Sequence, residues 1–124
     1  MVVMLVEKDE EVRNAVAEAF TQAGLEVAEL ADARAALALP SVAGTPSVLV
    51  TNLDFGPDMD GAGVKLAEEL QRRWPSLPVI YVSDRARNPK GTTLHHDDAC
   101  ISKPFEAAML LQMVRDLRET YQAH

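Results

Sequence analysis

The chain has 124 residues, of which 48% are hydrophobic and 25% charged, and this size and composition are typical of a single globular domain. Twelve basic residues against nineteen acidic ones give a net charge of −7, which argues against a nucleic-acid binder and favours proteins or small cations as partners. The apolar runs are far shorter than the roughly 20 residues that cross a bilayer, so no membrane span is expected.

The first 40 residues predict two strand–helix units. Residues 2–6 form a continuous apolar run, which is typical of a strand buried on both faces. Asp9 is expected to cap the following helix and Gly24 to end it. The apolar stripe of that helix consists of Val12, Ala15, Val16, Ala19, Phe20 and Ala23. Residues 25–30 then predict a second strand, and residues 32–39 a short helix before Pro40.

The rest of the chain repeats this alternation. Residues 48–50, 79–82 and 99–102 predict three further strands, and residues 52–60 a polar loop. Two amphipathic helices are expected, one marked by Val64, Ala67, Leu70 and Trp74 and the other, after Pro104, by Leu110, Met113, Val114, Leu117 and Tyr121. The signals weaken over residues 84–98, where we expect one short or irregular helical turn.

Five strands alternating with helices predict an α/β fold, a doubly wound parallel sheet with right-handed crossovers. In such sheets functional residues gather beyond the carboxyl ends of the strands. The residues that follow the apolar runs are Glu7, Lys8 and Asp9; Asn52 and Asp54; Ser83 and Asp84; and Ser102 and Lys103. We expect these side chains to form the functional site.

Four motifs occur in order along the chain: LVEKDEEVR at residues 5–13, VTNL at 50–53 followed by MDG at 59–61, LPVIYVS at 77–83, and SKPF at 102–105. Together they resemble the receiver domain of two-component response regulators, and the resemblance covers essentially the whole chain. It implies the CheY-like, flavodoxin-like (βα)5 fold, with a five-stranded parallel sheet in the order 2-1-3-4-5. It also implies a single stand-alone domain over residues 1–124 without an output domain, and a signalling protein rather than an enzyme.

A receiver takes a phosphoryl group from a histidine kinase onto an aspartate at the end of its third strand, with Mg²⁺ held by acidic residues after the first. A Ser or Thr after the fourth strand and a Lys after the fifth contact that group. The resemblance assigns metal binding to Glu7 and the two contacts with the phosphoryl group to Ser83 and Lys103. Three positions depart from the family pattern: Asn52 replaces the phosphoacceptor, Lys8 replaces a second acidic residue, and Cys100 replaces the aromatic switch residue.

Each departure has a chemical consequence. The amide of Asn52 has nearly the shape of a carboxylate but lacks its nucleophilicity, so phosphotransfer to Asn52 should fail. Mg²⁺ prefers carboxylate oxygens, and Glu7, Lys8 and Lys103 together carry a net charge of +1 instead of the −2 of a complete family site. We expect no metal or other cofactor. Our hypothesis is that the ammonium of Lys8, alone or together with that of Lys103, takes the place of the metal beside Glu7 and the Asn52 carbonyl.

Two alternatives stay open. In the first, Asp54 is a substitute phosphoacceptor, with Mg²⁺ held by Glu7, Asp9 and Asp54. Register favours Asn52, which lies eight positions before Asp60, as in family members with an extra loop residue, whereas Asp54 lies six before it. In the second, the chain is a small flavodoxin-like ligand-binding protein or enzyme, although the first strand is not followed by a glycine-rich dinucleotide motif.

The remaining expectations concern partners and single residues. We expect a cytoplasmic protein, because the lone Cys100 suits a reducing compartment, and a protein partner such as a histidine kinase, another regulator or a second copy of the chain. Cys100 is interpreted as a small buried filler, and Met109 and Met113 as core residues. The run HHDD at residues 95–98 is interpreted as a solvated loop rather than a metal site.

Overall fold

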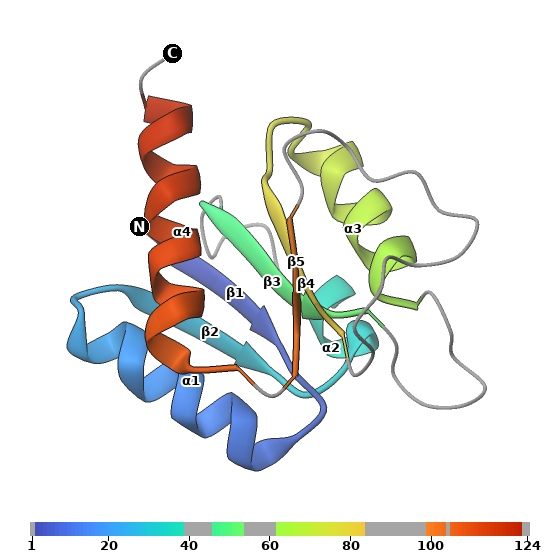
Figure 1. The fold of residues 1–124 in the computed structure, drawn as a ribbon. Coiled ribbons are helices and arrows are strands. Elements are labelled where there is room, and N and C mark those ends of the chain that lie inside the picture. Colours follow the sequence, from blue (N-terminus) through green and yellow to red (C-terminus); the bar gives the residue numbers. More distant parts are fainter. Residues whose placement is uncertain (1, 39–45, 54–61, 84–98, 104, 123–124) are drawn as a thin grey trace.

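A computed structural model describes residues 2–38, 46–53, 62–83, 99–103 and 105–122 (Figure 1). Its elements in chain order are β1 (Val2–Val6), α1 (Glu10–Gln22), β2 (Glu26–Leu30), α2 (Ala33–Leu37), β3 (Val48–Asn52), α3 (Ala62–Arg73), β4 (Val79–Ser83), β5 (Ala99–Ser102) and α4 (Ala107–Gln122). The five strands form one sheet in the order β2-β1-β3-β4-β5, and all neighbouring strands are parallel. The predicted fold class and strand order are confirmed.

The sheet separates two hydrophobic clusters, one under each helical layer. Figure 1 shows α1 and α4 on one side of the sheet and α2 and α3 on the other. Along β1, Val3 and Leu5 pack into the first cluster, and Met4 and Val6 into the second. Because successive side chains of a strand point to opposite faces, burial on both faces requires an unbroken apolar sequence. Burial on both faces of the sheet therefore explains why residues 2–6 form a continuous apolar run.

Helix α1 begins and ends as predicted, and most of its predicted apolar stripe packs on the core. Oδ1 of Asp9 accepts the backbone N–H groups of Glu11 and Val12, at 3.0 and 3.3 Å, so the predicted cap is confirmed. Gly24, with φ of 87°, adopts the left-handed conformation that favours glycine after a helix. Val16, Ala17 and Phe20 are buried, and Val12 and Ala19 pack against the same cluster. Ala15, a member of the predicted stripe, is exposed.

Two strands extend further than predicted, and one prediction for α4 is wrong. Strands β3 and β4 include Asn52 and Ser83, because the ladder continues through the pairs of Asn52 with Val82 and of Ser83 with Ser102. In α4, Met109 is 58% exposed instead of packing in the core. No helix in the described part of the chain is long and apolar enough to span a membrane. The turn predicted within residues 84–98 lies outside the described residues.

Candidate functional site

Four polar residues lie at the carboxyl ends of four neighbouring strands of the sheet. Glu7 follows β1, Asn52 and Ser83 are the last residues of β3 and β4, and Lys103 follows β5. Glu7, Asn52 and Ser83 are each only 2% exposed. Burial of polar groups is costly unless they are hydrogen-bonded, so their contacts define what this site can do. We call Glu7, Asn52, Ser83 and Lys103 the strand-end cluster.

The carboxylate of Glu7 is held by Lys103 and by the backbone of Asp9. Nζ of Lys103 lies 3.1 Å from Oε1 and 3.3 Å from Oε2 of Glu7, and the N–H of Asp9 donates to Oε2 at 2.9 Å. The Lys103 side chain is 18% exposed, so the ion pair is largely removed from water. Breaking such a pair leaves a buried charge without compensation, which strongly destabilises a fold.

The amide of Asn52 is oriented by the neighbouring strand. The backbone N–H of Lys8 donates to Oδ1 of Asn52 at 2.7 Å. Because an N–H group only donates, the accepting atom has to be the amide oxygen, and Nδ2 therefore faces the other way. The backbone carbonyl of Asn52 accepts the hydroxyl of Thr51 at 3.1 Å. The side chain at position 52 is thus neutral, and its single oxygen already accepts a hydrogen bond.

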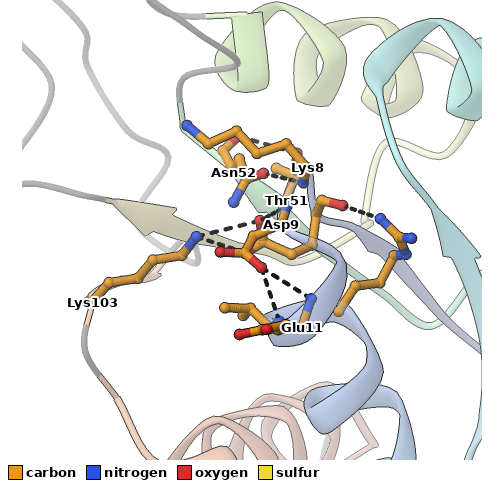
Figure 2. A network of polar contacts seen from close by, with 9 residues as sticks. Lys8, Asp9, Glu11, Thr51, Asn52 and Lys103 are labelled. Atoms are coloured by element: carbon orange, nitrogen blue, oxygen red, sulfur yellow. Dashed lines mark hydrogen bonds and ion pairs between the residues drawn. The ribbon is translucent and has the colours of Figure 1, made fainter.

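Lys8 and Lys103, the two lysines expected from the sequence to replace the metal, make different contacts. Lys103 pairs with Glu7, whereas the contact between Lys8 and Asn52 runs through the Lys8 backbone. Lys8 is exposed, and Figure 2 shows its side chain running alongside Asn52. The cation beside the buried carboxylate is therefore Lys103.

Ser83 and Cys100 are two further residues that the sequence predicts at this site. The backbone N–H of Lys103 donates to the carbonyl of Ser83 at 2.8 Å, which ties the chain after β5 to the end of β4. Cys100 lies within β5 and is half-buried, so its interpretation as a buried filler holds only in part. Burial raises the pKa of the Cys100 thiol, which keeps it neutral and weakly nucleophilic.

Two residues that support the cluster were given no role by the sequence. Arg13 donates from its guanidinium to the backbone carbonyl of Glu7 at 2.9 Å and so anchors the turn between β1 and α1. Gly63 packs so closely on β3 that a Cβ atom there would lie 1.8 Å from the carbonyl oxygen of Asn52. A glycine inside a predicted helix can indicate such close packing, and the sequence contains this signal at position 63.

Among the other acidic and histidine residues that the sequence singled out, only Asp9 lies within the described residues. Asp9 caps α1 with its carboxylate and contacts Glu7 through its backbone. Asp54, Asp84 and the HHDD run at residues 95–98 lie outside the described residues. Within the described ranges, no group of three or more His, Cys, Asp or Glu side chains is arranged to hold a metal ion.

The sheet order and the polar residues at the carboxyl ends of its strands define the class of flavodoxin-like α/β proteins. The sequence model named "Response regulator receiver domain" matches residues 3–115, and the chain belongs to this family. It is therefore a receiver domain of two-component signalling, a type of domain that typically signals rather than catalyses. No curated protein matches the chain.

Solved structures agree with this fold. A response regulator receiver protein from Sinorhizobium medicae WSM419 has a TM-score of 0.83 and 21% identity, over 96% of this chain and 94% of that one. The receiver domain of the hybrid histidine kinase CckA has a TM-score of 0.76 and 23% identity, over 95% and 99%. The chemotaxis protein CheY4 of Vibrio cholerae has a TM-score of 0.75 and 20% identity, over 94% and 97%.

Proposed function

We propose that this chain is an atypical receiver domain that works independently of phosphorylation and acts by binding a protein partner. Asn52 carries the proposal, because it is buried at the end of β3 with Oδ1 bound to the N–H of Lys8. Attack on phosphorus requires an anionic oxygen, and a neutral amide does not supply one. The conformation of the domain is then set by its sequence and by its partners.

The strand-end cluster also does not fit Mg²⁺. This ion requires near-octahedral coordination by oxygen and is usually held by one or two carboxylates. The cluster offers the carboxylate of Glu7, which already binds an ammonium and a backbone N–H. We propose that Lys103 supplies the positive charge that a metal provides in a complete site. Of the two lysines considered from the sequence, the contacts favour Lys103.

The receiver family and the net charge of the chain indicate which kinds of partner to expect. Receiver domains interact with histidine kinases and with other proteins. We propose that a histidine kinase, another signalling protein or a second copy of the chain is the partner here. The net charge of −7 disfavours nucleic acid, whose phosphates attract basic proteins.

A phosphorylation assay tests the proposal. Wild type, Asn52→Asp, and Asn52→Asp combined with Lys8→Asp are incubated with acetyl phosphate and Mg²⁺, and peptide mass spectrometry locates any added phosphoryl group. We expect none on the wild type and phosphorylation at position 52 of the double variant, because that variant restores the nucleophile and a metal-binding carboxylate.

The same assay separates the alternatives. A phosphoryl group on Asp54 of the wild type, lost in Asp54→Asn, would contradict the proposal and establish the substitute acceptor. Phosphorylation of the wild type at any other aspartate would contradict it equally.

A further inference from the structure

The side-chain amide nitrogen of Asn52 is a buried donor in the strand-end cluster. Asn52 is 2% exposed, and because its Oδ1 accepts the N–H of Lys8, the two N–H bonds of Nδ2 are directed elsewhere. Among the residues that the structure describes, Nδ2 has no hydrogen-bond partner. Burial of a donor without an acceptor is costly, so an acceptor atom from another molecule would be favoured at this nitrogen.

The charges around this amide favour an anion. Figure 2 shows the Lys8 side chain running alongside Asn52, and the amide of Asn52 and the ammonium of Lys103 on the same side of the cluster. Glu7, Lys8 and Lys103 together carry a net charge of +1, although the whole chain carries −7. The local charge is thus opposite in sign to that of the chain, and it disfavours a cation at Nδ2.

The number of charges selects the class of anion. A carboxylate brings one negative charge and two acceptor oxygens, and it would neutralise the net charge of the three residues. A phosphate group carries about −1.5 to −2 at pH 7. Removing this larger charge from water costs more, and the burial of Asn52 makes that cost important. The cluster therefore fits a carboxylate better than a phosphate.

We propose that the strand-end cluster binds the carboxylate of an aspartate or glutamate side chain of the partner protein. One carboxylate oxygen accepts from Nδ2 of Asn52, and the ammonium groups of Lys8 and Lys103 balance the charge. Lys8 is exposed and the Lys103 side chain is 18% exposed, so the carboxylate enters on the side of these ammonium groups. The inference rests on the proposed protein-binding function and names the group that the partner supplies.

A blocked amino acid tests the site directly. The probe is N-acetyl-aspartate amide, and its control is N-acetyl-asparagine amide, which has nearly the same shape without the charge. Each is titrated into ¹⁵N-labelled protein at constant ionic strength. We expect the aspartate probe to shift the side-chain NH₂ signals of Asn52 and the backbone signals of Lys8 and Lys103 in a saturable way. The asparagine control should bind at least tenfold more weakly.

Matched variants decide whether the binding is specific. Asn52→Asp removes the Nδ2 donor and adds a negative charge but keeps an acceptor for the N–H of Lys8, whereas Asn14→Asp makes the same change at an exposed position of α1. We expect Asn52→Asp to weaken the aspartate probe at least tenfold and Asn14→Asp to leave it unchanged. Lys8→Met should also weaken the probe, whereas Lys65→Met, exposed on α3, should not. Circular dichroism verifies folding, and the lysine pair decides the test if Asn52→Asp is unfolded.

Several results would overturn the inference. They are the absence of saturable binding, equal affinity for the two probes, signal shifts centred away from Asn52, and equal losses in the paired variants. Inorganic phosphate that binds more tightly than the aspartate probe would overturn the assignment to a carboxylate. Phosphorylation of the wild type would instead contradict the proposed function while leaving the aspartate result standing.

Discussion

Nζ of Lys103 lies 3.1 Å from Oε1 of Glu7, although the two residues are 96 positions apart in the chain. This ion pair joins the residue after β1 to the residue after β5, across the end of the sheet (Figure 2). Because the Glu7 side chain is 2% exposed, Lys103 compensates a carboxylate that water hardly reaches.

Loss of Lys103 should therefore destabilise the domain. We expect Lys103→Met to lower the free energy of unfolding by about 3–5 kcal/mol, because Glu7 then remains buried without its cation. Urea unfolding measures this value. Lys65→Met, at an exposed position of α3, should change it by no more than about 0.5 kcal/mol. Equal stability of the two variants would show that the ion pair contributes nothing.

The hydrogen bond between Lys8 and Asn52 should be visible in amide exchange. Asn52→Leu removes the acceptor of the Lys8 N–H and should destabilise the domain by about 1–3 kcal/mol, whereas Asn52→Asp keeps an acceptor oxygen. Hydrogen exchange followed by NMR should show the Lys8 amide protected in the wild type and in Asn52→Asp and less protected in Asn52→Leu. The same protection in all three proteins would exclude this bond.

Gly63 should not tolerate a side chain. In Gly63→Ala the new methyl group would lie 1.8 Å from the backbone oxygen of Asn52, so α3 or β3 must move. We expect a loss of about 1–3 kcal/mol, as is typical of overpacking, although alanine is the better helix former. Thermal unfolding measures it against Glu68→Ala, an exposed change in the same helix. A more stable Gly63→Ala protein would mean that helix propensity outweighs the close contact.

Cys100 should make stability fall at alkaline pH. Burial raises the pKa of its thiol in the folded protein, so the contribution is fully present below about pH 8.5, the pKa of an unfolded cysteine, and is lost as pH rises through the folded value. Chemical denaturation between neutral and alkaline pH should show a smaller decline for Cys100→Ser than for the wild type. Parallel curves for the two proteins would contradict this assignment.

Much of the fold could be predicted because its signals are local. Apolar runs and helical stripes indicated every strand and helix that the structure describes, within a few residues at each boundary. The ends of β3 and β4 were predicted too early, because Asn52 and Ser83 are polar but still pair with their neighbouring strands. At the site, the sequence named Glu7 and Asn52 correctly as strand-end residues but favoured Lys8 as the nearby cation.

The sequence by itself determined the succession of elements, the cap at Asp9 and the presence of an amide at position 52, because each depends on residue type and near spacing. Only the tertiary structure decided which lysine meets Glu7, how closely Gly63 approaches β3, and that Ala15 stays exposed. These features depend on how distant segments pack against one another, and periodicity within one segment does not encode such distances.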